Sequence, residues 1–186
     1  MDTLPTDLQR LAAALHYAAH CHRNQRRKNE EQHPYINHPI SLLHVLAVEA
    51  HITDADVLCA AVLHDVIEDC AKNPAERAER STEIEQQFGA RVLKIVEEVT
   101  DDKTLNKAER KQAQIDHAKH LSHAAKLVKL ADKTVNLRDV ATSPPVGWPL
   151  RRRREYFDWA YEVVQAIGPT HARLRKLFDQ AYAARP

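Results

Sequence analysis

Apolar residues recur at intervals of three and four along most of this 186-residue chain, and such spacing places them on one face of an α-helix. The composition agrees, because the chain has only three glycines and is rich in Ala, Leu, Glu, Arg and Lys, which are strong helix formers. The pattern predicts helices over residues 6–21, 39–47, 55–67, 82–89, 91–99, 124–141, 150–166 and 170–184, with a highly charged surface segment at 107–120. We therefore expect an all-α protein, a helical bundle that forms a single domain over residues 1–186.

Local signals indicate where some of these helices begin. Asp54 is a favourable N-cap for the helix that follows it, and Pro39 suits the first position of its helix. Thr82 and Glu85 have the spacing of a capping box, in which each side chain satisfies a backbone N–H of the first turn. If a helix begins there, residues 70–80 before it form a solvated, mobile loop.

Charge, cysteine content and hydropathy limit the class of protein. A formal net charge of +1 gives no general attraction to nucleic acid or to an anionic membrane, so an anion site has to be a local cluster. Cys21, Cys59 and Cys70 are odd in number and two of them lie in helical patterns, which favours reduced thiols and a cytoplasmic location. We expect neither a membrane span nor a signal peptide, because no apolar stretch reaches the ~18–20 residues that span a membrane and the N-terminus is acidic and polar.

One polar motif interrupts an apolar run. The run at residues 57–63 is followed by His64-Asp65-x-x-Glu68-Asp69. On a helix, positions 64 and 68 share a face, and so do positions 65 and 69. Folding alone does not require two such pairs at this place. A divalent metal ion beside an acid/base carboxylate does require them.

The candidate metal ligands are His38, His64, Asp65 and Asp132. Neighbouring side chains on a helix point about 100° apart, so His64 and Asp65 could occupy adjacent corners of an octahedron. Asp132 borders an apolar stripe, where a carboxylate without a partner would be costly. Two imidazoles and two carboxylates suit Mn²⁺ or Fe²⁺ and could accept Zn²⁺. Each residue also has a simpler interpretation: His38 before a proline as a structural histidine, His64-Asp65 as an ion pair at a helix end, and Asp132 as the partner of a neighbouring lysine.

The segments around these residues resemble a known family. The matching segments, which run in order over about residues 10–165, include Gln25-Arg26-Arg27-Lys28, Pro34-Tyr35-Ile36-Asn37-His38-Pro39, Leu63-His64-Asp65-Val66-Ile67-Glu68-Asp69, Glu98-Val99-Thr100-Asp101-Asp102-Lys103 and Lys129-Leu130-Ala131-Asp132-Lys133-x-x-Asn136-Leu137-Arg138-Asp139. They resemble the HD-domain metal-dependent phosphohydrolases, and among these the stand-alone guanosine 3′,5′-bispyrophosphate hydrolases, small alarmone hydrolases of the metazoan SpoT homologue type. The resemblance implies an all-helical HD bundle, a bound Mn²⁺ ion and a role in the stringent response. It also implies that water attacks the 3′ pyrophosphate of ppGpp or pppGpp, giving GDP or GTP and pyrophosphate.

The resemblance further implies roles for individual residues. Glu68 and Asp69 match the Glu-Asp pair that orients or deprotonates the water and handles the leaving-group proton. Arg27 and Lys28, in a basic segment that we expect to be an ordered loop, match a clamp for the substrate phosphates. Of the arginines at 151–154, at most two can face one pocket. The remaining substrate contacts that the family implies are Lys107, Asn136, Arg152 and Tyr156.

The chain also departs from the family pattern. The family usually has a glycine after the Arg-Lys pair, whereas residues 29–33 contain none, so Asn29 is the candidate for a positive φ. Cys70 replaces a common threonine, and the 70–80 segment is longer than usual. The chain is too short for the synthetase and regulatory domains of the bifunctional enzymes, so we expect hydrolysis without synthesis.

Two alternative functions remain open at this point. A phosphatase for the 2′-phosphate of NADPH would act on a similar sugar bearing two phosphate groups. The other alternative is a degenerate HD domain that senses a nucleotide without hydrolysing it. The presence of all four candidate ligands together with Glu68 and Asp69 argues against this alternative, because a protein that only binds has no use for an acid/base pair. We expect a small-molecule nucleotide as partner, with no nucleic acid and no membrane; an apolar helix face could support a homodimer.

Overall fold

The computed structural model describes residues 5–186 and confirms the all-α prediction. Within these residues the only β pairing is an isolated bridge between Arg26 and Pro34. The helices are α1 (Asp7–Cys21), α2 (Asn37–His44), the π-helix η1 (Val45–Glu49), α3 (Ala55–Leu63), α4 (Val66–Asp69), α5 (Pro74–Phe88), α6 (Ala90–Val99), α7 (Lys107–Ala118), α8 (His123–Thr142), α9 (Leu150–Ile167) and α10 (Ala172–Ala183). None of these helices is long and apolar enough to cross a membrane.

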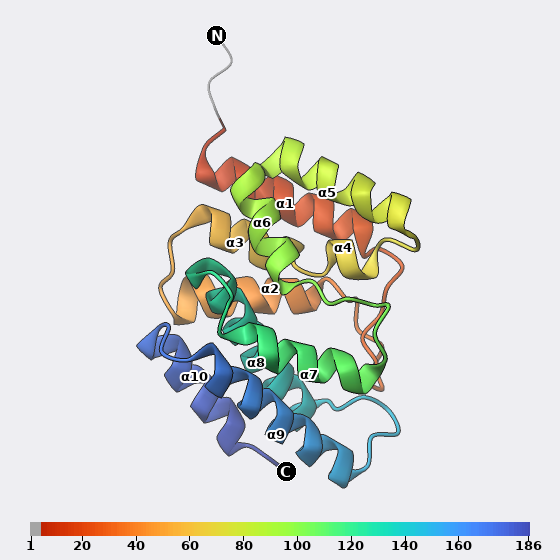
Figure 1. Ribbon diagram of the computed structural model, residues 1–186, viewed down its shortest axis with the longest axis vertical. Helices are drawn as coiled ribbons and strands as arrows, with labels where there is room; N and C mark the ends of the chain where they lie inside the picture. The colour runs from red at the N-terminus through yellow and green to blue at the C-terminus, as the bar shows by residue number, and fades with distance from the viewer. Residues whose placement is uncertain (1–4) are drawn as a thin grey trace.

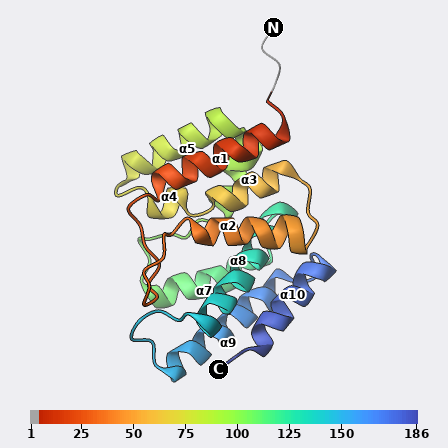
Figure 2. The same cartoon turned by 180° about the vertical axis from the view of Figure 1, so that it is seen from behind.

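Helix α8 lies at the centre of the bundle (Figures 1 and 2). On one side α1, α3, α5 and α6 pack together, and on the other side α7, α9 and α10 do, while α8 contacts members of both groups as well as α2. Because α8 has neighbours on several sides, it buries polar as well as apolar residues, among them Lys129, Lys133 and Thr134. A polar residue on α8 can therefore lie deep inside the molecule.

A continuous hydrophobic cluster joins the two groups of helices. Its large buried side chains come from distant parts of the chain, for example Leu42 of α2, Leu63 of α3, Phe157 of α9 and Phe178 of α10. Burying side chains of this size contributes roughly 1.5–3 kcal/mol each. The same packing fixes α2, the end of α3 and α8 beside one another, and these three elements carry the candidate metal ligands.

Several predicted helix ends are confirmed, and one is shifted. The side chain of Asp54 accepts hydrogen bonds from the backbone N–H groups of Asp56 and Val57, at 3.1 and 3.4 Å, as an N-cap does. Pro39 is not the first residue of its helix, because α2 begins at Asn37. Proline is tolerated there because the N–H groups of a first turn have no partner within the helix.

The predicted loop at 70–80 and the capping box at Thr82 are wrong. Helix α5 begins at Pro74, and the side chain of Asn73 caps it by accepting a hydrogen bond from the Glu76 N–H at 2.9 Å. Thr82 lies inside the helix, where its hydroxyl donates to the Ala78 carbonyl. The buried residues of α5 all lie in its second half, so its first turns show no apolar periodicity that would identify them as helical.

The predicted 55–67 helix is interrupted at the polar motif. Helix α3 ends at Leu63 and α4 begins at Val66, so His64 and Asp65 occupy a turn between the two helices. Asp65 has φ −99° and ψ −1°, away from ideal helical values. Because the helix breaks here, the directions of these two side chains do not follow from simple helical spacing.

The glycine-free loop after the Arg-Lys pair closes in an unexpected way. Gln32, rather than Asn29, has the positive φ, at 49°. Asn29 is buried instead, and its side-chain amide donates to Glu31 and to Ser143 at 2.7 and 3.1 Å. The loop is thus ordered, as predicted, by side-chain hydrogen bonds to the end of α8.

Candidate metal centre and active site

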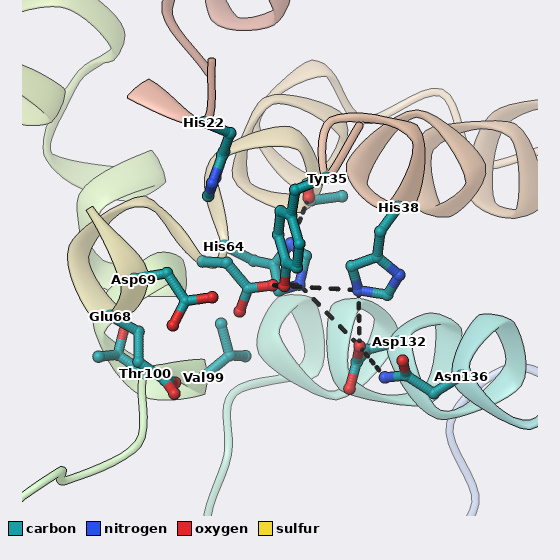
Figure 3. Close-up of polar contacts among 12 residues, drawn as sticks. His22, Tyr35, His38, His64, Glu68, Asp69, Val99, Thr100, Asp132 and Asn136 are labelled. Carbon is teal, nitrogen blue, oxygen red and sulfur yellow. Dashed lines mark hydrogen bonds and ion pairs between the residues drawn. The ribbon is translucent and has the colours of Figure 1, made fainter. Parts of the chain in front are cut away.

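A cavity of about 800 Å³ opens between α4, α7, α8 and α9. His38, His64, Asp65 and Asp132 line one part of it, and cationic and aromatic residues of α7 and α9 line another. Figure 3 shows that His38 of α2, His64 of the α3–α4 turn and Asp132 of α8 point toward one another. The carboxylate of Asp65 contacts both imidazoles. The structure thus brings together residues that are separated by up to 94 positions in the sequence, from 38 to 132.

The donor atoms of the four ligands lie close together. Nε2 of His64 is 2.9 Å from Oδ2 of Asp65 and 3.9 Å from Oδ1 of Asp132. Nε2 of His38 is 3.2 Å from Oδ1 of Asp132 and 4.0 Å from Oδ2 of Asp65. With metal–ligand bonds of about 2.1 Å, ligand atoms at right angles are about 3.0 Å apart and opposite ones about 4.2 Å apart. These four distances lie in that range. Donor atoms of His38, His64 and Asp65, one from each, lie within 4.8 Å of one another, and Asp132 joins this group through its contacts with the two imidazoles.

The hydrogen bonding of His64 supports an ion at this place. Its Nδ1 lies 2.8 Å from the Ala61 carbonyl and donates to it, so its Nε2 is the nitrogen with a free lone pair. That Nε2 is buried, and its 2.9 Å contact with Oδ2 of Asp65 is an ion-pair contact without hydrogen-bond geometry. A metal ion would satisfy this atom. The donor set of two imidazole nitrogens and two carboxylate oxygens therefore fits a divalent cation.

The local electrostatics also favour a positive charge between the ligands. Burial lowers the pKa of His64, but the Asp65 carboxylate outweighs it and raises that pKa to about 9. Burial raises the pKa of Asp132, but Lys133 and His38 hold it well below its ordinary value. The cluster thus retains two carboxylates that need a cation, and a divalent ion can take the place of the proton on His64.

Neighbouring residues fix the two carboxylates. The Asn136 amide donates to Oδ1 of Asp132 at 2.6 Å, and Nζ of Lys133 lies 3.2 Å from Oδ2. The predicted pairing of Asp132 with a neighbouring lysine is thus present, while its other oxygen faces His38. The Tyr35 hydroxyl donates to Oδ2 of Asp65.

Glu68 and Asp69 lie beside the ligands in different surroundings (Figure 3). Burial, with the nearby charges of Asp65 and Asp101, raises the pKa of Glu68 to about 7, although the Asp101 N–H donates to its carboxylate at 3.1 Å. Asp69 instead accepts hydrogen bonds from Lys103 and from Gln25, both at 2.8 Å. Glu68 can therefore exchange a proton near neutral pH, whereas Asp69 is held by two donors.

The predicted substrate contacts fall on two connected cavities. Lys28, Lys107, Asn136, Arg152 and Tyr156 all line the cavity that contains the candidate ligands. Arg27 lines only an adjoining cavity of about 580 Å³, where its guanidinium pairs with Asp139 at 2.5 Å. Arg151 and Arg152 face the first cavity and Arg153 and Arg154 do not line it, in agreement with the expected limit of two arginines.

Sequence reasoning gave no role to several residues of this site. Nζ of Lys111 and of Lys133 lie 4.8 and 4.4 Å from the ring centroid of Trp159, and the Arg152 guanidinium lies 4.3 Å from that of Trp148. These contacts form an aromatic and cationic wall on α9 and the loop before it. Lys103 lies in one of the segments that match the family, but sequence reasoning assigned it no role; in the structure it donates a hydrogen bond to Asp69. From the sequence alone, a single tryptophan in an amphipathic helix looks the same whether it lines a cavity or packs in the core.

Comparisons with known proteins agree with this geometry. The family model described as HD domain matches residues 14–157. The chain is 47% identical over 175 residues, 94% of this chain and 93% of the relative, to the zebrafish (Danio rerio) protein called guanosine-3′,5′-bis(diphosphate) 3′-pyrophosphohydrolase MESH1. It is 48% identical to the mouse (Mus musculus) protein of the same name over 97% of each chain.

A solved structure is similar over the whole chain. It is described by the words "A metazoan ortholog of SpoT hydrolyzes ppGpp and plays a role in starvation responses". The TM-score is 0.88 at 44% sequence identity, covering 99% of this chain and 98% of the other. The likeness in fold therefore covers α7 and α9 as well as the elements that carry the candidate ligands.

Proposed function

This chain belongs to the HD-domain family, and from that premise we propose that it is a metal-dependent phosphohydrolase of guanosine 3′,5′-bis(diphosphate). The reaction removes the 3′ pyrophosphate of ppGpp or pppGpp and gives GDP or GTP together with pyrophosphate. The observation that carries the proposal is the convergence of His38, His64, Asp65 and Asp132 at the base of a cavity large enough for a nucleotide. Relatives named for this activity match the chain over almost its full length.

We propose Mn²⁺ as the metal. The mixed nitrogen and oxygen donors, without a thiolate, suit Mn²⁺ and Fe²⁺ and can accept Zn²⁺. When bound, the ion supplies a water of lowered pKa and offsets negative charge on the phosphate oxygens. Tyr35, Asn136 and Lys133 then keep Asp65 and Asp132 oriented as ligands.

Glu68 and Asp69 have the catalytic roles in this proposal. Glu68, with a pKa of about 7, accepts the proton of the attacking water and can pass it on at neutral pH. Asp69, held by Lys103 and Gln25, orients the water or the leaving group. Lys103 also lies 3.9 Å from Glu68, so one cation lies beside both carboxylates.

The cations of the cavity bind the phosphates. Lys28, Lys107 and Arg152 lie on its lining and can pair with the anionic groups that remain on the substrate. Asn136 and Tyr156 are placed to contact the ribose or the phosphates. A small-molecule nucleotide is thus the proposed partner of a single HD domain over residues 1–186, and we propose a cytoplasmic location for it.

A second candidate, hydrolysis of the 2′-phosphate of NADPH, draws support from one feature. The adjoining cavity of about 580 Å³ shares Lys28, Tyr35, Asn136 and Tyr156 with the first, so the site has room beyond a mononucleotide. A dinucleotide needs such room. Both substrates present a phosphate on a ribose to the ligand cluster.

A substrate panel tests these proposals. Purified protein is loaded with Mn²⁺ and given ppGpp, pppGpp or NADPH, before and after chelation. Release of pyrophosphate from the guanosine substrates, lost on chelation and restored by Mn²⁺, is the expected result. Release of inorganic phosphate from NADPH alone favours the second candidate. Tight binding of a nucleotide without turnover would show that the domain is a sensor and would contradict both enzymatic proposals.

A further inference from the structure

The carboxylate of Glu68, the proposed base, is held by one backbone group. Its Oε2 accepts a hydrogen bond from the Asp101 N–H at 3.1 Å, and no other donor in the described part of the chain hydrogen-bonds to this carboxylate. Lys103 lies 3.9 Å from its Oε1 as an ion pair. Figure 3 shows the residues just before Asp101, Val99 and Thr100, beside Glu68. Helix α4 is a single turn, so the direction of the Glu68 side chain depends on these contacts outside the helix.

The side chain of Asp101 is attached to two other helices. Its Oδ2 accepts a hydrogen bond from Nε2 of Gln114 on α7 at 2.5 Å. Its Oδ1 lies 3.9 Å from Nζ of Lys129 on α8. Lys129 is only 8% exposed, and it also donates to the carbonyl of Val99, the last residue of α6, at 3.0 Å. The segment that carries the Asp101 N–H is therefore fixed by side chains of α7 and α8.

Lys129 connects this segment to the candidate metal ligands. It lies on α8 three positions before Asp132, so the two side chains are neighbours on one helix. Because a buried ammonium requires an anionic partner, the carboxylate of Asp101 has a reason to stay beside it. Asp101 is not itself a candidate ligand, since its oxygens are directed to Gln114 and Lys129. The helix that carries a metal ligand thus also fixes the segment that holds Glu68.

We propose that Asp101 is a positioning residue for the reaction: its backbone N–H directs the carboxylate of Glu68, and its side chain, attached to Gln114 and Lys129, fixes that N–H. The inference rests on the proposed function, in which Glu68 accepts the proton of the water. A base has to be aimed at the proton that it accepts, so a displaced carboxylate lowers kcat. Asp101 is an anion and does not attract phosphates, so KM should not depend on it.

Kinetics of substitutions at this position test the proposal. Asp101→Ala removes both attachments and should lower kcat for ppGpp about tenfold, with KM and metal content unchanged. Asp101→Asn keeps an oxygen that can accept from Gln114, so it should recover most of the lost kcat. The matched control is Asp102→Ala, which should keep the wild-type kcat. Asp102 is the exposed next residue, and its carboxylate accepts from Thr104 in the same loop.

A second variant guards against loss of stability. Asp101→Ala leaves the buried Lys129 without this carboxylate, whereas Gln114→Ala removes the other attachment and strands no charge. Gln114→Ala should also lower kcat at constant KM. An unchanged kcat in Gln114→Ala together with an Asn variant no better than Asp101→Ala would show that the side-chain attachments do not matter, and the proposal would be wrong.

A double-mutant cycle separates positioning from a general structural role. In the Glu68→Gln background, Asp101→Ala should lower kcat by less than about twofold, because the group through which Asp101 acts is already gone. A loss of about tenfold in both backgrounds would overturn the proposal, because Asp101 would then act independently of Glu68. Loss of metal, or a rise in KM without a fall in kcat, would overturn it as well.

Hydrogen exchange of the residue 101 amide, followed by NMR with chelator present, tests the geometry without turnover. The protection factor, which corrects for the change of side chain, should fall at least about tenfold in Glu68→Ala and in Asp101→Ala. An unprotected amide in the wild type would contradict the proposed positioning, whether or not the protein hydrolyses ppGpp. A protein that shows this protection yet hydrolyses no ppGpp would contradict the proposed function and support the contact between Asp101 and Glu68.

Discussion

The two sides of the cavity are built in different ways. On the ligand side, His38 and His64 are buried, and the side chains of Asp65 and Asp132 expose only 18% and 14% of their surface. Each of these residues lies on an element fixed by the central core. On the α7 and α9 side, Lys107 and Arg152 are exposed, and Arg152 packs on an aromatic ring rather than on a carboxylate.

This difference separates two tasks. Under the proposed function, the buried side would hold groups whose charges balance one another around an ion, so a change there should remove the ion and the chemistry together. The exposed side presents cations that an anionic substrate could neutralise, so under the proposed function a change there should weaken binding of the substrate. Substitutions on the buried side should therefore change metal content and kcat, whereas substitutions on the exposed side should change KM.

Replacing a ligand should have the largest effect. Asp65→Ala removes an oxygen donor and the carboxylate nearest to His64, so metal retention and turnover should be lost together. Loss of outer partners of a metal alone costs about 10–100-fold, and the loss here should exceed that. Metal content by mass spectrometry and initial rates with ppGpp give the measurement. The control is Asp179→Ala, an exposed aspartate of α10 paired with Arg175; full activity in Asp65→Ala would remove this residue from the ligand set.

Replacing the proposed base should change kcat but not metal content. Glu68→Gln should lower kcat by roughly 100- to 10,000-fold. In the wild type, kcat should fall as the pH drops through the pKa of Glu68, which is about 7 without metal. The nearby ion lowers that pKa, because positive charge favours the carboxylate, so the acidic limb should lie at or below pH 7.

The matched measurement is the pH profile of Glu68→Gln, with metal content followed at each pH. Gln cannot take up the proton, so the acidic limb should disappear while the metal remains bound. A limb of unchanged position and height in the variant would show that another group accepts the proton.

Substitutions on the exposed side should act on KM. Arg152→Ala should raise KM for ppGpp about tenfold, which corresponds to one charge-assisted hydrogen bond of ~1.4 kcal/mol, with little change in kcat or metal content. Arg154→Ala is the matched control, because Arg154 lies on the same helix and donates to Pro186 instead of lining the cavity. Similar kinetics of the two variants would show that Arg152 does not meet the substrate.

The smallest effect is expected outside both sides, at the start of α5. Asn73→Ala removes the N-cap and should lower the free energy of unfolding by about 1 kcal/mol. Thr82→Ala, in the exposed middle of the same helix, should change it by less than about 0.5 kcal/mol. Urea unfolding of both variants with chelator present is the measurement. If Thr82→Ala lowered the free energy of unfolding more than Asn73→Ala, the result would support the original prediction that the helix begins near residue 82.

Features that depend on near neighbours in the sequence were predicted correctly more often than features that depend on distant contacts. Asp54 was identified as an N-cap because a cap acts within three residues, and the caps at Thr6 and Asn106 follow the same rule. The start of α5 was missed although Asn73-Pro74 is a good start signal, because the helix buries only Ile84 and Phe88. The break at His64–Asp65 was missed because the apolar pattern continues through Val66 and Ile67.

The sequence by itself determined an all-α protein, and it supplied two imidazoles, two carboxylates and an acidic pair in a pattern similar to HD hydrolases, because helix formation and residue chemistry depend on near neighbours. The tertiary structure alone decided that the imidazoles of His38 and His64 lie within 4.0 Å of the carboxylates of Asp65 and Asp132, because these distances depend on how α2, α3 and α8 pack in a common core. It also decided which arginines of α9 face the cavity. Contacts between distant segments are set by the packing of whole helices, and no local pattern records them.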